Sequence, residues 1–258
     1  MHPNQKLAAS GETGKSPSIC IWDTVTMKTV SVLKKDEAHT HGVGSVAFSP
    51  CGGRVLSVGI DPYSLVAIWD WEAARMLTIV KGHSDRIFDS CFLPNSDSSF
   101  VTVGVKHLKV WDVMGNTLKS KRGIFGSKGS LQTVLCCCRD VHNNRVITGT
   151  MDGSIYAWAG NELDVALPNI APGPIYSIVA TEDGFVAAGK FGRIIVLSAE
   201  LEVVQEYSLG DFEEELASSY IRSVAQLGSE FLVATAQSEI VLLNTEEEAL
   251  NWVVRSGS

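Results

Sequence analysis

No stretch of this 258-residue chain is apolar over the 18 or so consecutive residues that a membrane-spanning helix needs. The N-terminal residues MHPNQK also lack the apolar core of a secretory signal peptide. Positive charge is scarce, because 21 lysines and arginines face 29 aspartates and glutamates, a net charge of −8. Nucleic-acid binding depends on a basic surface that displaces counterions from phosphates. These absences predict a cytoplasmic protein without a membrane or nucleic-acid partner.

The cysteines show neither metal-binding nor disulfide spacing. None of the six belongs to a Cys-x-x-Cys pair, and no Asn-x-Ser/Thr glycosylation site occurs. Consecutive strand residues point to opposite faces, so the run of three cysteines cannot converge on one ion. We predict no metal or cofactor, and reduced cysteines buried in strands at Cys20, Cys51, Cys91, Cys136, Cys137 and Cys138.

Motifs of the common enzyme classes are missing too. The sequence contains no Gly-x-Ser-x-Gly nucleophile turn, no glycine-rich phosphate loop and no His-Glu-x-x-His helix. We therefore predict that the protein is not an enzyme and has no catalytic residues. One alternative stays open, because two carboxylates far apart in the sequence could meet in the fold and form a glycosidase without a linear motif.

What the chain does contain is a repeating strand ending. Four copies carry tryptophan, in ICIWD at Trp22, VAIWD at Trp69, LKVWD at Trp111 and IYAW at Trp158. Two further copies, RIIVL and EIVLL, end in Leu197 and Leu243. The intervals between these positions are 47, 42, 47, 39 and 46 residues. This is the period of one four-stranded blade of a WD-repeat propeller.

Within each period, runs rich in β-branched and apolar residues alternate with turns rich in glycine, proline, aspartate and asparagine. After Trp22 such runs occupy residues 29–33, 43–48, 54–59 and 65–69. We predict an all-β propeller that forms a single domain over residues 1–258. It has five complete blades from about residue 43 to 255, preceded by a partial first blade without its inner strand. These six blades would form a ring of six, or part of a ring of seven.

The repeat also predicts which side chains are structural. Large residues on the third strand of a blade fill the space between neighbouring sheets, so we expect an inter-blade core, not an aromatic ligand cage, at Trp22, Trp69, Trp111 and Trp158.

Histidines and aspartates of the turns complete the pattern. His39 and His83 each lie nine residues before a phenylalanine, the position of the turn histidine in this repeat. Asp61 and Asp152 lie in turns before the third strand, where an acidic partner is expected. The third blade has Lys106-His107 at that place, so we expect its polar network to be broken.

Segments such as HSDRIFD, GVKHLKVW and KRGIFG are more specific than a general WD repeat. Because it contains these segments, the sequence resembles the echinoderm microtubule-associated protein-like family. The resemblance extends over nearly the whole chain and is strongest over residues 39–136. The match is closest to the long, multi-propeller members. The resemblance implies a non-enzymatic cytoskeletal protein that binds tubulin or microtubules. It also implies a chain truncated at both ends, because the family adds a hydrophobic motif and one blade upstream and a second propeller downstream.

A local reversal of charge suggests where a partner binds. Residues 113–138, named here the basic segment, contain no acidic residue. We predict that the segment attracts acidic tubulin tails through Lys119, Lys121, Arg122, Phe125 and Lys128. Two alternatives stay open. The charges could merely solvate a loop, with Phe125 tucked under the blade, or the protein could be a generic WD-repeat scaffold that captures a peptide over its central opening.

Overall fold

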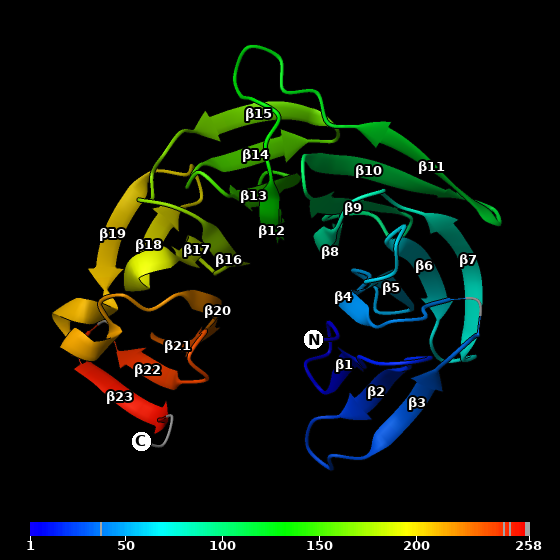
Figure 1. Cartoon of the computed structure of the whole chain (residues 1–258), viewed down its shortest axis with the longest axis horizontal. Coiled ribbons are helices and arrows are strands. Elements are labelled where there is room, and N and C mark those ends of the chain that lie inside the picture. Colours follow the sequence, from blue (N-terminus) through cyan, green and yellow to red (C-terminus); the bar gives the residue numbers. More distant parts are fainter. Residues whose placement is uncertain (37, 245, 248, 256–258) are drawn as a thin grey trace.

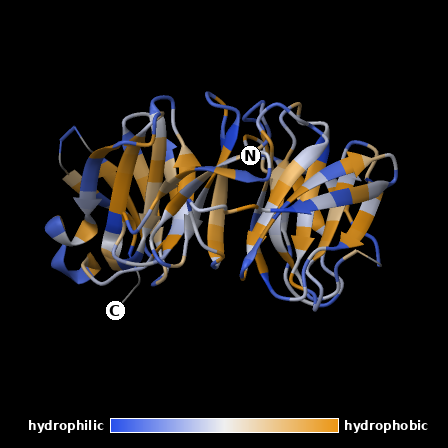
Figure 2. Cartoon of the chain, turned by 90° about the horizontal axis from the view of Figure 1, so that it is seen from above, coloured by the Kyte–Doolittle hydropathy of each residue, from blue (hydrophilic) through white to orange (hydrophobic). Residues whose placement is uncertain are grey.

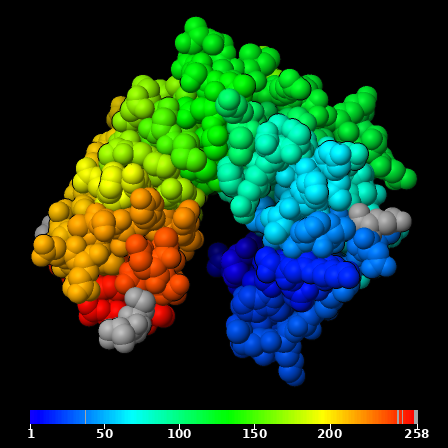
Figure 3. Space-filling model, in the orientation of Figure 1, coloured from blue at the N-terminus to red at the C-terminus, as the bar shows by residue number. Residues whose placement is uncertain are grey.

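The computed structural model describes residues 1–36, 38–244, 246–247 and 249–255. These residues form six β-sheets, arranged as blades around a common axis (Figure 1). The first and the last blade face each other across an opening, which is also visible in the space-filling view (Figure 3). The predicted all-β propeller of about six blades is confirmed.

The strands of each blade follow one another from the axis outwards. Blade 1 comprises β1 (Leu7–Gly11), β2 (Ile19–Asp23) and β3 (Thr29–Leu33). Blade 2 comprises β4 (Val43–Phe48), β5 (Arg54–Gly59), β6 (Leu65–Asp70) and β7 (Arg75–Lys81), and blade 3 comprises β8 (Ile87–Phe92), β9 (Ser99–Gly104), β10 (His107–Met114) and β11 (Thr117–Arg122). Blade 4 comprises β12 (Val134–Asp140), β13 (Arg145–Thr150), β14 (Ile155–Ala159) and β15 (Glu162–Leu167).

Blade 5 comprises β16 (Ile175–Ala180), β17 (Gly184–Gly189), β18 (Arg193–Ser198) and β19 (Val203–Ser208), and blade 6 comprises β20 (Ile221–Leu227), β21 (Glu230–Thr235), β22 (Ile240–Asn244) and β23 (Ala249–Val254). In the part of the chain that the structure describes, three short 3-10 helices lie near the turns of blades 5 and 6, namely η1 (Lys190–Gly192), η2 (Leu209–Asp211) and η3 (Glu214–Leu216). The described residues contain no helix that is long and apolar enough to cross a membrane. Seen from the side, apolar residues fill the strands while many of the turns at the rims are hydrophilic (Figure 2).

Indole rings lie between neighbouring blades. Trp69, Trp111 and Trp158 are at most 3% exposed, and each packs against apolar residues of the preceding blade. Leu197 and Leu243 take the same place in blades 5 and 6. Each indole N–H donates to a hydroxyl of its own blade, at 2.8 Å to Ser57, 2.9 Å to Thr102 and 3.0 Å to Thr148. The rings therefore fill the gaps between sheets and leave no buried donor unpaired.

Trp22 differs from the other three. Its neighbour Ile21 is fully buried against blade 2, so Trp22 faces the opposite way, towards the opening, and is only half-buried. The expectation of an inter-blade position is corrected here, because no described blade precedes blade 1.

A half-buried carboxylate links three inner strands. Asp89 on β8 accepts hydrogen bonds from the Ser45 hydroxyl on β4, at 3.3 Å, and from the Cys137 backbone N–H on β12, at 3.0 Å. Burial raises the pKa of Asp89, while these donors oppose the rise. The carboxylate thus links blades 2, 3 and 4 near the axis.

All six cysteines are free thiols, but they are not all buried. Cys91, Cys136 and Cys137 are buried in inner strands, whereas Cys51 is exposed in the turn between β4 and β5, contrary to prediction. Burial is the main cause that raises the pKa of the Cys136 thiol, and a hydrogen bond with Cys91, followed by burial, raises that of Cys137.

These differences predict selective alkylation. In the native protein, iodoacetamide should modify Cys51 first, because the thiolate is the reactive form and Cys51 is open to solvent. Cys136 and Cys137 should react only after unfolding in urea. Mass spectrometry of peptides from native and unfolded samples measures this, and early labelling of Cys136 would contradict the described packing.

Candidate partner-binding surface

The turn histidine of blade 2 belongs to a structural chain of polar groups. The ring of His39 is buried, and its Nε2 lies 2.8 Å from the Ser57 hydroxyl that also accepts the Trp69 N–H. Its Nδ1 lies 3.5 Å from the Asp61 carboxylate. Burial lowers the pKa of His39 although Asp61 opposes the change, so the imidazole is neutral near pH 7. This chain fixes the turn against the sheet.

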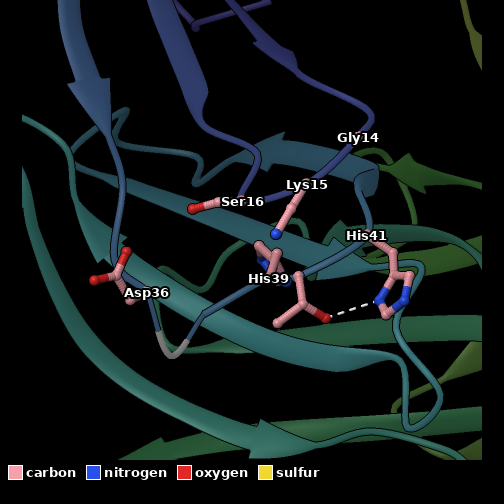
Figure 4. A pocket seen from close by; sticks show the side chains of 7 residues that line it. Gly14, Lys15, Ser16, Asp36, His39 and His41 are labelled. Atoms are coloured by element: carbon pink, nitrogen blue, oxygen red, sulfur yellow. Dashed lines mark hydrogen bonds between the residues drawn. The ribbon is translucent and has the colours of Figure 1, made fainter.

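A pocket of about 590 Å³ opens beside His39 (Figure 4). Its lining includes Lys15, Asp36 and His41, and the Asp36 carboxylate points away from His39 in the close-up. His41 is engaged by the Thr40 hydroxyl at 2.8 Å. The described residues contain no group of three or more potential ligands that could hold a metal ion.

Blade 3 keeps a polar chain that we expected to be broken. The His107 Nε2 lies 2.8 Å from the Thr102 hydroxyl, which also accepts the Trp111 N–H. His83 instead lies against the His107 ring, with centroids 4.4 Å apart, and its Nε2 donates to the Val105 carbonyl at 3.1 Å. His107, at the first position of β10, thus does in blade 3 what His39 does in blade 2.

In blade 4, Asp152 is bound by hydroxyl and amide groups. Its carboxylate accepts hydrogen bonds from the Thr150 hydroxyl at 2.7 Å and from the Gln132 amide at 2.9 Å. These donors hold the pKa of Asp152 below its usual value although burial acts in the opposite direction. Asp152 therefore secures the turn before β14 without the histidine that Asp61 contacts.

The basic segment does not form one continuous face. Lys119 and Lys121 pair with Asp112 and Val110 on β10, whereas Arg122 pairs with Lys109. Because successive residues of a strand alternate, Arg122 lies on the face of β11 opposite to the two lysines. All three side chains are exposed. The sequence therefore places two separate charged surfaces on one outer strand.

Two members of the predicted set are held by the protein itself. Lys128 donates to the Asp164 backbone carbonyl at 2.6 Å and lies 3.9 Å from the carboxylate of the same residue. The Phe125 ring packs edge-on against Trp158 at 5.0 Å and against Tyr156 at 6.1 Å. The interpretation in which Phe125 tucks under a blade is the one that the structure shows. Lys119 and Lys121 remain as the exposed charges of this face.

A further surface surrounds one end of the axis. Each complete blade has a β-bulge at the second residue of its inner strand, where the register shifts by one residue. These five residues, the bulge ring, are Gly44, Phe88, Leu135, Tyr176 and Arg222. Each is half-buried or exposed, although the residue before it is buried. Bulges re-aim side chains, so the ring presents two aromatic residues, one leucine and one arginine at this end of the inner strands.

The other end of the inner strands has a different character. A pocket of about 380 Å³ there is lined by Met1, by Arg139 and by apolar residues of four inner strands. No aspartate or glutamate is among the described residues that line it. The pair of facing carboxylates that a glycosidase would need is not found in this pocket.

Comparison with known proteins identifies the family. A family model described as the echinoderm microtubule-associated protein first beta-propeller matches residues 1–243. The chain belongs to this family.

Curated relatives of this echinoderm microtubule-associated protein family match over almost the whole chain. The mouse echinoderm microtubule-associated protein-like 1 is 27% identical over 256 residues, covering 93% of the chain and 31% of its own length. Mouse echinoderm microtubule-associated protein-like 2 is 25% identical and covers 94% of the chain and 38% of its own length. The 77 kDa echinoderm microtubule-associated protein of Strongylocentrotus purpuratus is 26% identical, with 93% and 36% covered. The chain thus spans about a third of the length of these relatives.

Solved structures support the fold of this family member. The β-propeller domain of Cps50 (Swd1) from Myceliophteria thermophila superposes with a TM-score of 0.80 at 16% identity, covering 99% of the chain and 84% of that domain. The C-terminal WD40 domain of Sif2 gives a TM-score of 0.70 at 13% identity, with 95% and 70% covered. At these identities the likeness shows the WD-repeat propeller fold alone.

Proposed function

We propose that this propeller is a non-enzymatic interaction platform in the cytoplasm that binds tubulin or microtubules. The observation that carries the proposal is the family match over residues 1–243, because the relatives are named as microtubule-associated proteins. The descriptions of the matched family model and of the two solved propellers name no catalytic activity. The surface that we assign to the contact is the face of β11 with Lys119 and Lys121.

The proposed contact is electrostatic. Lys119 and Lys121 lie two residues apart on an exposed outer strand, so both ammonium groups point to the same side. An acidic partner is attracted to such a face at a rate and with an affinity that fall as salt rises. Because the whole chain carries a net charge of −8, this positively charged face is a distinct local target.

We expect the double substitution Lys119→Glu/Lys121→Glu to weaken co-sedimentation with polymerised tubulin by roughly tenfold at low salt. It should also flatten the dependence of binding on salt concentration. Lys28→Glu/Lys34→Glu is the matched control, because it changes net charge equally on exposed positions of blade 1. An equal loss in both variants would mean that only net charge matters and would refute this surface. Absence of pelleting by the unmodified protein at low salt would refute the function.

The bulge ring favours a second candidate, a scaffold that captures a peptide over the axial opening. The Arg222 guanidinium lies 4.5 Å from the centre of the Tyr176 ring, and the Tyr220 ring lies 6.3 Å from that of Tyr176. Aromatic and arginine side chains dominate the energetic centres of protein interfaces. If the protein is such a scaffold, affinity purification will recover a partner list without tubulin, and Tyr176→Ala/Arg222→Ala will lose these partners while Lys119→Glu/Lys121→Glu keeps them.

A further inference from the structure

A pocket of about 270 Å³ lies on blade 3, on the side of β11 away from Lys119 and Lys121. Five of its lining residues can carry positive charge, and no described lining residue is acidic. We call it the cationic pocket, after His83, Lys106, His107, Lys109 and Arg122. The remaining lining residues are glycine or apolar, among them Phe125, which is anchored on Trp158. The site thus combines concentrated positive charge with a fixed apolar wall.

The pocket places two like charges directly opposite each other. Lys109 on β10 and Arg122 on β11 are cross-strand partners, an arrangement that destabilises a sheet when nothing compensates it. Burial, followed by the charge of Arg122, lowers the pKa of Lys109. Its ammonium donates to the Gly82 carbonyl at 2.7 Å, a neutral acceptor that removes none of the charge.

Carboxylates do not neutralise this cluster. Among the described residues, neither Lys109 nor Arg122 has a carboxylate within ion-pair distance, 4.0 Å. Asp85 lies 4.0 Å from the His83 Nε2, but its side chain is 66% exposed and outside the lining. The pocket is therefore a site of positive potential without an internal counterion.

The pKa of His107 is affected by the same positive charges. Burial, followed by the charges of His83, Lys109 and Arg122, lowers its pKa to about 3. The His107 ring is consequently neutral at pH 7, while Lys106, Lys109 and Arg122 line the pocket as cations. Lys106 is exposed at the turn before β10, whereas Lys109 is half-buried. Lys106 thus lies at the solvent-exposed side of the pocket, and Lys109 lies deeper in it.

We propose that the cationic pocket binds an oxyanion, either a free phosphate or the phosphate or carboxylate of a partner's side chain, with Arg122 and Lys106 as its main ligands. A guanidinium donates two parallel hydrogen bonds to such a group, and an oxyanion relieves the repulsion between Lys109 and Arg122. The inference goes beyond the proposed function, because it concerns another face of β11 and requires no tubulin.

The first test uses inorganic phosphate and the whole chain. The midpoint of thermal unfolding is measured against phosphate concentration, with sodium chloride at matched ionic strength as the reference. Because a ligand of the folded state stabilises it by mass action, phosphate should raise the midpoint of the unmodified protein and of the Lys28→Gln/Lys34→Gln control. The variant Lys106→Gln/Arg122→Gln should show an apparent Kd that is weaker by roughly tenfold or more.

The second test distinguishes the source of the oxyanion. Fluorescence anisotropy compares labelled pentaglycine-based peptides whose central residue is phosphoserine, glutamate or glutamine. A response to phosphate alone supports a free ion, and binding of the phosphoserine or glutamate peptide, lost in Lys106→Gln/Arg122→Gln, supports a side chain. The proposal is overturned if phosphate acts no better than chloride while no acidic peptide binds better than the glutamine peptide. It is also overturned if the pocket variant responds like the control.

Discussion

Trp158→Ala is expected to lower the free energy of unfolding by about 3–5 kcal/mol, the cost of removing a fully buried large aromatic residue. The Trp158 side chain is 0% exposed and lies between blades 3 and 4, where Phe125 and Tyr156 also contact it. Its loss leaves a cavity between two sheets and removes the N–H that the Thr148 hydroxyl accepts, although this hydroxyl still donates to the Tyr156 carbonyl at 3.3 Å. Urea denaturation followed by circular dichroism measures the change.

Trp22→Ala is the matched control, because it removes the same side chain from the equivalent position of blade 1. Trp22 is half-buried, on the face of β2 opposite to Ile21, so its removal should cost only about 1 kcal/mol. Equal losses in the two variants would mean that Trp22 is packed against another blade and would contradict the open arrangement of the six sheets.

Acidification is expected to produce the second large effect. His107 has a folded-state pKa of about 3, whereas an unfolded histidine titrates near 6.5. Between these two pH values, the unfolded chain binds a proton at this histidine that the folded chain does not. The contribution of His107 to the free energy of unfolding is therefore fully present above about pH 6.5 and is lost as the pH decreases. At pH 4 the loss attributable to His107 is about 3 kcal/mol. His39, whose pKa is also lowered, adds to it in the same direction.

The variant His107→Gln isolates this contribution. Glutamine has no charge to gain, yet its amide can still bond the Thr102 hydroxyl that His107 contacts. Urea denaturation between pH 7 and pH 4 should therefore give a shallower loss of stability for the variant than for the unmodified protein. The aspartates with lowered pKa, such as Asp61 and Asp152, affect both proteins alike. Parallel pH profiles would show that His107 takes up a proton freely in the folded state.

The propeller could be predicted because each blade repeats its strand and turn signals locally. The period between Trp22, Trp69 and the later strand endings gave the number of sheets, and the turns rich in glycine and proline gave the strand limits. A first blade without its inner strand also followed from counting. These features depend on residues that are close together in the sequence, so one sequence is enough to predict them.

The surface was harder to predict because it depends on register and on contacts between distant turns. Lys121 and Arg122 are adjacent in the sequence but lie on opposite faces, which becomes clear only once β11 is paired with β10. The bulge ring likewise needs the register of five inner strands. His107, and not His83, contacts the Thr102 hydroxyl, although the two histidine rings lie against each other. The sequence spacing of the two histidines does not show which of them reaches Thr102.

The opening between blades 1 and 6 makes the molecule a one-dimensional stack instead of a closed circle. In such a stack the stability of a unit comes from itself and its immediate neighbours. Among the described residues, blades 1 and 6 each have one neighbouring blade, so fraying of this stack begins at these two blades and leaves the remaining cores whole. Loss of a middle blade, in contrast, divides the hydrophobic interior into two independent pieces.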